Sequence, residues 1–272
     1  NLIIDGTADI LSKLHYTPRA VLLYTSCIHH FINCDLSYVY STLRQKFPEI
    51  DFIDCYMTPT MRKSGLTPEE LIAKQIHALW HKRPLNKKQL NLIGNNIQTD
   101  KNCELYNLAQ KNGFNLREIH DCRNYDEYQE MAAASLNILF RRAALPGAEY
   151  LKQTYGQKYL YLPCSYNYEE MLDTLRIFAD YLDVELPDYS PYQALISQKL
   201  AEMHRIIVAT PIMLDYTVSA QYLSLARLLL ENGFNVVRIY TDSFNEDNEK
   251  DFYFIKEHFP AVEINATINF KM

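Results

Sequence analysis

The chain has 272 residues and a net charge of −6; 48% of its residues are hydrophobic and 22% are charged. This composition is typical of a folded globular protein, and the length predicts two or three structural units rather than one small core. The acidic balance argues against nonspecific nucleic-acid binding, and no apolar run approaches the roughly 18 residues that span a bilayer.

Asn1–Ile10 lacks the basic-then-apolar pattern of a secretory signal, so we expect a soluble, cytoplasmic protein. The chain begins with asparagine rather than methionine, which indicates a fragment or a processed chain. Six cysteines are spread along it without a C-x-x-C pair. We expect reduced, mostly buried thiols; the alternative is that one of them binds a metal cluster.

Short apolar runs rich in β-branched or aromatic residues predict strands. In chain order the strands are Ala20–Thr25, Ile50–Tyr56, Leu90–Gly94, Leu116–His120, Leu136–Phe140, Tyr159–Leu162, Ile206–Thr210 and Val236–Tyr240, with a ninth candidate at Val262–Ile264. The apolar spacing between them predicts helices: Ser37–Phe47, Pro68–Trp80, Cys103–Asn112, Ala148–Tyr155, Tyr168–Leu182 and Ser219–Asn232. This alternation predicts an α/β fold of repeated Rossmann-like units, with parallel sheets flanked by helices.

One short stretch occurs twice and supports repeated units. Leu108–Leu116 and Leu229–Val236 each read as a helix end, a glycine turn and a strand start. Gly113 and Gly233 stand where a helix needs a left-handed residue after its last turn, which glycine adopts without a side-chain clash.

Two segments predict exposed linkers. His81–Lys88 is basic and contains a proline, and Asp183–Pro191 contains two prolines among polar residues. We therefore expect three pieces: 1–85 as a partial first Rossmann-like domain, 86–187 as the second, and 188–272 as the third, which is incomplete if the chain is a fragment.

The common nucleotide-binding loops are missing from the sequence. It contains only seven glycines, with no G-x-G-x-x-G after a strand and no G-x-x-x-x-G-K-[ST]. A backbone that closes on a pyrophosphate needs such glycines, so no nucleotide site of these types is expected.

The segment after the first strand, Tyr24–Asp35, is the densest in reactive side chains. Cys27 is expected at the carboxyl edge of that strand, close to a helix start, and a helix N-terminus favours the thiolate that a metal needs. His29, His30 and Cys34 are further metal-ligand candidates. The alternative is that Cys27 is a small core residue and the histidines are polar loop residues, with Asp35 as a helix N-cap.

A second candidate site follows two strands of the middle piece. Asn95 and Asn96 leave the strand Leu90–Gly94, and Arg141 and Arg142 leave the strand Leu136–Phe140. If both strands share one parallel sheet, these side chains meet at its carboxyl edge, where such sheets bind ligands. They predict a site for a small anion in the cleft between the second and third pieces. The alternatives are a loop in which Asp100 caps the next helix, and arginines in surface ion pairs.

Five segments in order carry a resemblance to a known family: Ser26–Leu36, Asp54–Pro59, Asn91–Asn96 with Asp100, Ser135–Leu139 and Tyr150–Gly156. Together they resemble the nitrogenase component 1 family, from about residue 20 to residue 240. That family includes molybdenum–iron protein subunits, cofactor-assembly scaffolds and subunits of the light-independent protochlorophyllide reductase.

The resemblance implies three Rossmann-like domains, a paralogous or identical subunit as partner, and an ATP-dependent iron–sulfur reductase as electron donor. It implies an iron–sulfur cluster between paired subunits, to which only Cys27 of this chain can contribute. A cluster is expected in the full-length complex and none in this chain alone. No nucleic acid or membrane partner is implied.

The chain also departs from the family pattern. Phe140-Arg141-Arg142 stands where catalytic subunits have a cysteine for the active-site cofactor, and Asn33 replaces a glycine near Cys27. These departures indicate a diverged paralogue and leave open whether it is an oxidoreductase enzyme. Two functions are expected: a redox subunit that passes electrons through an iron–sulfur cluster, or a non-catalytic scaffold that holds a metallocluster precursor or a small anion.

Overall fold

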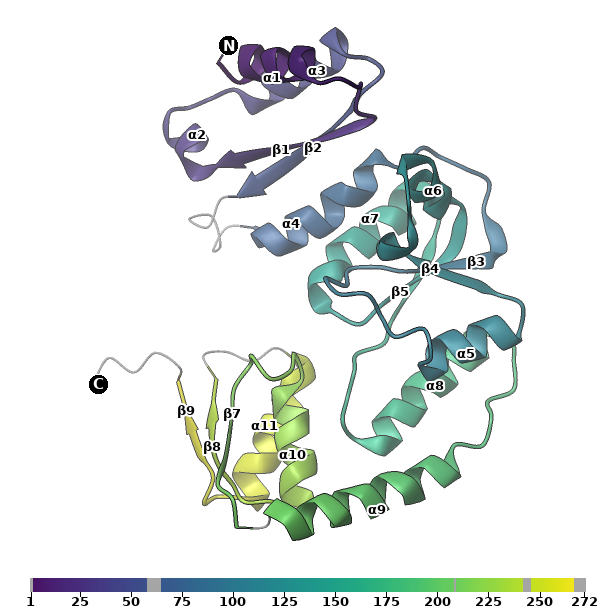
Figure 1. Cartoon of the computed structure of the whole chain (residues 1–272), viewed down its shortest axis with the longest axis vertical. Helices are drawn as coiled ribbons and strands as arrows, with labels where there is room; N and C mark the ends of the chain where they lie inside the picture. Colours follow the sequence, from purple (N-terminus) through teal and green to yellow (C-terminus); the bar gives the residue numbers. More distant parts are fainter. Residues whose placement is uncertain (1, 58–64, 208, 242–245, 267–272) are drawn as a thin grey trace. The chain divides into compact units, whose positions relative to one another are not determined.

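The computed structural model of the chain describes residues 2–57, 65–207, 209–241 and 246–266. They form two compact units, Asn1–Leu162 and Pro163–Met272. Three sheets run through the units, and every strand pair in the described ranges is parallel, with helices flanking the sheets (Figure 1). The predicted α/β class is therefore confirmed. Each of the three expected pieces holds one sheet, whereas the compact units divide the chain after Leu162, so the three-domain division stays a prediction.

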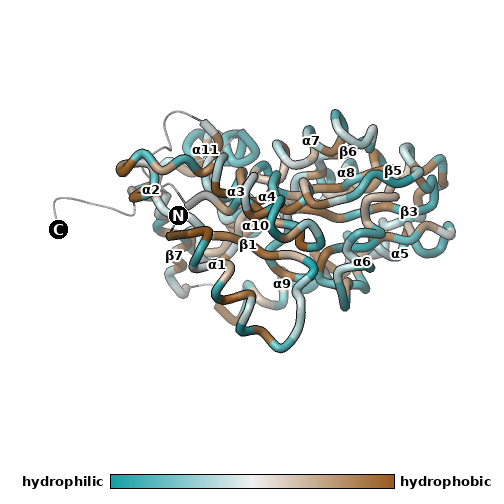
Figure 2. Tube along the Cα trace, turned by 90° about the horizontal axis from the view of Figure 1, so that it is seen from above, coloured by the Kyte–Doolittle hydropathy of each residue, from teal (hydrophilic) through white to brown (hydrophobic). Residues whose placement is uncertain are grey.

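The first sheet has two strands, β1 (Ala20–Ser26) and β2 (Asp51–Met57), paired along their whole length. Helices α1 (Leu2–Lys13) and α3 (Leu36–Lys46) pack on one face around a buried apolar cluster. Figure 2 shows the first residues of β1 as a hydrophobic trace. The short helix α2 (Cys27–Phe31) follows β1 directly. Asp35 caps α3 as expected, because its carboxylate accepts the Tyr38 N–H at 2.9 Å.

The second sheet has the strand order β4-β3-β5-β6. Its strands are β3 (Asn86–Leu92), β4 (Asn115–Glu118), β5 (Ala134–Leu139) and β6 (Lys158–Tyr161). The chain steps from β3 outward to β4 and then back past β3 to β5 and β6. Right-handed crossovers therefore place α5 (Glu104–Lys111) on one face and α6 (Tyr125–Glu130) and α7 (Leu145–Tyr155) on the other (Figure 1).

Helix α4 (Pro68–Gln75) packs against α7 of the second sheet. Its start is fixed by a capping box between Thr67 and Glu70 and by Pro68 in the first turn. A Cβ atom on Gly147 would lie only 2.7 Å from the backbone oxygen of Ala73, so the two helices need glycine at this contact. A 3₁₀ turn, Ile76–Leu79, continues α4 toward the sheet.

The second unit contains the third sheet, with the order β7-β8-β9. Its elements are α8 (Tyr168–Leu182), α9 (Ser190–Ile207), β7 (Ile212–Leu214), α10 (Tyr222–Glu231), β8 (Val236–Tyr240), α11 (Glu246–His258) and β9 (Glu263–Asn265). Both crossovers of this sheet run in the same direction, so α10 and α11 cover the same face (Figure 1). A buried apolar cluster forms between them and the strands.

The repeated glycine turn has the predicted geometry in both units. Gly113 and Gly233 have φ angles of +71° and +78°. After α5, the N–H of Phe114 donates to the Ala109 carbonyl at 2.9 Å and that of Gly113 donates to Gln110 at 3.1 Å. The equivalent hydrogen bonds of Phe234 and Gly233 end α10. At each helix the pair of bonds forms a Schellman motif. The local sequence therefore determines how both helices end.

Valine at Gly113 or at Gly233 is expected to destabilise the fold by about 1 kcal/mol or more, because a β-branched residue is strained at positive φ. Chemical denaturation followed by circular dichroism measures the effect. Asn33→Gly is the matched control, since Asn33 already has a φ of +51° and glycine removes strain there. Valine variants as stable as the parent chain would contradict the left-handed assignment.

Most predicted elements lie within a few residues of the observed ones, but two predictions are wrong. The strand expected at Ile206–Thr210 overlaps the end of α9, and the strand that pairs with β8 is Ile212–Leu214. Asp100 does not cap α5: its carboxylate accepts the N–H of Asn102 at 2.9 Å, and the N-cap residue is Cys103. Val208 and the Thr58–Pro59 end of one segment that carries the family resemblance lie outside the described residues.

Five helices were not predicted: α1, α2, α6, α9 and α11. The sequence pattern also predicted mostly buried cysteines, whereas only Cys55 is fully buried and Cys164 is exposed. In the described part of the chain, no helix is both long and apolar enough to cross a membrane.

Candidate functional site

A pocket of about 440 Å³ opens in the first unit, at the carboxyl ends of β3 and β4. Helix α4 forms its opposite wall, and the segment after β5 closes one side. Most lining residues are apolar, and the polar ones are Glu69, His77, Asn95, Asn96, Glu118 and His120. An apolar pocket with a few convergent polar groups at this edge of a parallel sheet is a typical small-molecule site.

The structure places Asn95 and Asn96 in the lining of this pocket, within the first unit, whereas the sequence predicted a ligand site in the cleft between the second and third pieces. They follow a tight turn at Gly94, whose φ angle is +80°. A hydrogen bond holds the Asn95 amide in place, because its Nδ2 donates to the Thr99 hydroxyl at 2.9 Å. The Asn95 side chain therefore has a fixed position in the lining.

Arg141 and Arg142 lie nearby but are not among the residues that line the pocket. Arg141 forms an ion pair with Glu69 of α4, which does line it. The guanidinium of Arg142 lies 6.0 Å from the ring centroid of Tyr161. The expectation that both arginines bind a ligand, in a cleft between the second and third pieces, stays a prediction.

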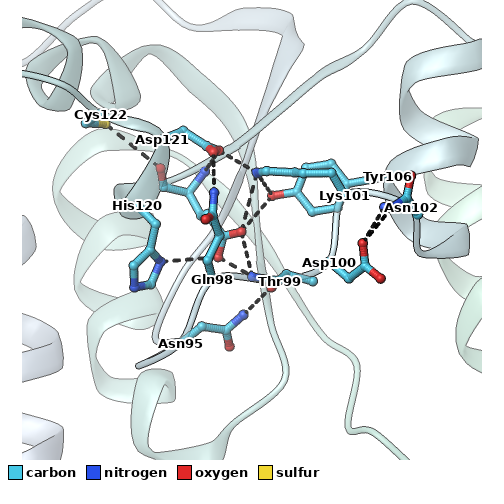
Figure 3. A network of polar contacts seen from close by, with 11 residues as sticks. Asn95, Gln98, Thr99, Asp100, Lys101, Asn102, Tyr106, His120, Asp121 and Cys122 are labelled. Carbon is cyan, nitrogen blue, oxygen red and sulfur yellow. Dashed lines mark hydrogen bonds and ion pairs between the residues drawn. The ribbon is translucent and has the colours of Figure 1, made fainter.

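Glu118 ends β4 and is the centre of a polar network beside the pocket (Figure 3). It is only 1% exposed. Its Oε1 accepts hydrogen bonds from the Thr99 N–H at 3.0 Å, the Tyr106 hydroxyl at 3.0 Å and Lys101 Nζ at 3.4 Å. Its Oε2 accepts from the Thr99 hydroxyl at 3.4 Å and lies 3.5 Å from Nδ1 of His120. The carboxylate is therefore fixed on one side and faces a histidine on the other.

Two groups around Glu118, Tyr106 and Asp121, have shifted pKa values that support this arrangement. Burial and the neighbouring carboxylate of Glu118 raise the pKa of Tyr106, so its hydroxyl stays protonated and donates. Burial alone would raise the pKa of Asp121, but hydrogen bonds from Lys101 and from the Glu118 N–H hold that pKa below its ordinary value. Lys101 thus joins two carboxylates, with Asp121 Oδ2 at 2.7 Å.

His77 lies in the pocket wall on the turn that follows α4. It is 6% exposed, and burial lowers its pKa to about 3, so the imidazole is neutral near pH 7. Among the described residues its Nδ1 has no hydrogen-bond partner. A buried polar atom without a partner is costly, and a ligand group in the pocket is one way to satisfy it.

Sequence reasoning missed Glu118, His120 and His77. Glu118 was part of a predicted apolar strand. The available signal was a glutamate within that strand, two residues before a histidine. His77 stood inside a predicted helix, where nothing in the sequence showed that it would face a cavity. Only the packing of α4 over the sheet edge brings these residues to one pocket.

The thiol of Cys27 lies at the start of α2 and is partly exposed. An iron–sulfur cluster takes about four ligands, usually thiolates. In the described ranges, no group of three or more Cys, His, Asp and Glu side chains could hold a metal ion. His29 is oriented by the backbone, because its Nδ1 accepts the Ser26 N–H at 3.1 Å. The described residues therefore do not form a cluster site by themselves.

Asn33 keeps the backbone conformation of the glycine that the family resemblance implied at its position. Its φ angle of +51° is left-handed, and asparagine is one of the few residues that tolerate that region. The departure from the pattern therefore preserves the local turn after Cys27.

The sequence matches the family Nitrogenase component 1 type Oxidoreductase over residues 12–267. A chain of the solved structure "Nitrogenase Cp1 at pH 6.5" is 12% identical with a TM-score of 0.70, and the alignment covers 98% of this chain and 64% of that one. A chain of "Nitrogenase Cp1 at pH 5" is 15% identical with a TM-score of 0.56, covering 94% and 56%. The chain thus spans less than two thirds of these structures, and their likeness shows the fold alone. No curated protein matches the sequence.

Proposed function

Because the chain belongs to the nitrogenase component 1 type oxidoreductase family, we propose that it is a subunit that binds a small molecule in the pocket of its first unit. One observation carries this proposal: the apolar pocket gathers Asn95, Asn96, His77 and His120 at the carboxyl edge of the second sheet. The mainly apolar lining favours a ligand with an apolar body and one polar group. Arg141 and Arg142 are proposed to contribute at the rim, where Arg141 pairs with Glu69.

A thermal-shift titration with 2-naphthoate tests this binding function. The parent chain is expected to gain thermal stability with probe concentration, because a ligand that binds only the native state stabilises it. Ala143→Trp is expected to abolish the gain by filling the pocket, since Ala143 is a lining residue. The matched control is Ala201→Trp on the exposed face of α9. A gain that survives Ala143→Trp would place the probe elsewhere.

The same titration on the double variant Arg141→Ala, Arg142→Ala separates the arginines from the rest of the site. If they bind the anion directly, the stabilisation by 2-naphthoate is expected to fall. An undiminished gain would show that the arginines are not ligand residues.

A second candidate function is that of a redox subunit, supported by Cys27 at the end of β1. In this proposal Cys27 supplies one thiolate of an iron–sulfur cluster, and a paralogous or identical subunit supplies others. The apolar side chains beside it support a subunit partner, because Ile28, Phe31 and Ile32 are 58%, 76% and 68% exposed. Electrons would come from an ATP-dependent iron–sulfur reductase.

Iron and sulfide analysis tests the cluster. The 272-residue chain purified alone in air is expected to carry none, since one thiolate cannot hold a cluster that needs about four ligands. Full-length protein purified anaerobically with its partner is expected to contain iron that is lost in Cys27→Ala and kept in Cys164→Ala. Near-stoichiometric iron in the isolated chain, or iron unaffected by Cys27→Ala, would contradict the assignment.

A further inference from the structure

We propose that His120, held by Glu118, binds the carboxylate end of the ligand in the pocket, so that the ligand class is an apolar carboxylic acid. This inference rests on the proposed binding function. It assigns the central polar contact to a histidine at the edge of β4, whereas the two arginines after β5 are proposed to contribute at the rim.

Within the described ranges, the imidazole of His120 has one polar side-chain neighbour, Glu118. Its Nδ1 lies 3.5 Å from Oε2 of Glu118, and His120 lines the pocket. Figure 3 shows the ring with one nitrogen toward the Glu118 network and the other nitrogen turned away from it. A carboxylate at Nδ1 fixes the ring orientation and leaves Nε2 to meet a ligand.

Glu118 can serve this role because its own position is rigid. It is almost completely buried, and Thr99, Tyr106 and Lys101 all donate to its Oε1. The cation that offsets its charge, Lys101, approaches that same oxygen and also Asp121. Oε2, which also accepts from the Thr99 hydroxyl at 3.4 Å, is therefore the oxygen that faces Nδ1 of His120.

Two other polar groups of the pocket lining, Glu69 and His77, present no positive charge to an anion. Glu69 of α4 is paired with Arg141, and His77 is neutral because burial lowers its pKa to about 3. An imidazole between two carboxylates donates to both when each of its nitrogens carries a proton, and Nε2 then forms a charge-assisted hydrogen bond with the ligand carboxylate. Asn95 and Asn96 line the same pocket, and an amide group carries both donors and an acceptor.

The test compares two probes of the same shape, 2-naphthoate and 2-naphthamide, by isothermal titration of the 272-residue chain. The parent chain is expected to bind the carboxylate about 10-fold more tightly, as a charge-assisted hydrogen bond provides. His120→Phe is expected to remove this preference while the amide still binds. Glu118→Gln is expected to reduce it, because the imidazole loses its charged partner.

His15→Phe is the matched control, since His15 is exposed before β1 and does not line the pocket, and the preference of this variant is expected to stay near that of the parent. Equal binding of both probes to the parent, or a preference that survives His120→Phe, would overturn the assignment to His120 and leave the pocket intact. Absence of binding by both probes would overturn the pocket itself, and with it this inference.

Discussion

Alanine at Gly94 is expected to destabilise the first unit by about 2–4 kcal/mol, the sum of left-handed strain and overpacking. Gly94 has a φ angle of +80°, and a Cβ atom there would lie 2.2 Å from the Cβ of Ala144. Ala144 is buried, so it has no open space into which to move. The loop that carries Asn95 would have to shift, and binding of 2-naphthoate is expected to weaken with the stability.

Gly113→Ala is the matched control for Gly94→Ala. Gly113 has a similar φ angle of +71°, but a Cβ atom added there would have no neighbouring atom within 4 Å. Its substitution is expected to cost about 1–2 kcal/mol, from backbone strain alone. Denaturation followed by the fluorescence of Trp80, the one tryptophan of the chain, measures both variants in the first unit. Equal losses for the two variants would contradict the predicted contact with Ala144.

Alanine at Arg227 is expected to destabilise the second unit by about 3 kcal/mol, because it leaves a buried carboxylate without its partner. Arg227 of α10 reaches Asp251 of α11 at 3.1 Å, and Asp251 is 1% exposed. The guanidinium also lies 3.9 Å from the ring centroid of Phe254. The Arg227–Asp251 pair therefore joins the two helices that cover the third sheet.

The loss of stability caused by Arg227→Ala should depend on pH. Burial raises the pKa of Asp251 in the folded chain, although Arg227 opposes this rise. A raised pKa means that the folded state takes up a proton more readily than the unfolded state, so its stability falls as the pH rises through that pKa. Without Arg227 the pKa rises further, and the destabilisation should be larger at pH 7.5 than at pH 4.5.

Denaturation followed by circular dichroism measures the Arg227 effect at both pH values. Arg176→Ala is the control, since its pair with Asp173 is exposed and should contribute less than about 1 kcal/mol. Adding Asp251→Asn to Arg227→Ala is expected to recover part of the stability, because a neutral amide is less costly to bury than a charge. A loss that is equal at both pH values and is not recovered by Asp251→Asn would show that packing on Phe254, rather than charge, is responsible.

The order of strands and helices along the chain could be predicted from the sequence because each signal for it is local. Alternating apolar runs, the capping residue Asp35 and the glycines after α5 and α10 act within one or two turns of chain. Their structures are confirmed at those positions, and the family resemblance is confirmed as well. The strand expected at Ile206–Thr210 failed for the same reason: its β-branched residues favour a strand locally, whereas the eighteen residues of α9 form one helix.

The fold class, the left-handed turns and the carboxyl edge at which Asn95 and Asn96 lie follow from local sequence patterns. Which groups line the pocket at that edge depends on packing between distant segments. Helix α4 crosses over that edge and brings His77 into the wall, and it pairs Glu69 with Arg141. The burial of Glu118 and its approach to His120 depend on contacts between β4, α5 and the loop at Thr99. Such contacts join residues far apart in the chain, so their energies leave no periodic signal in the sequence.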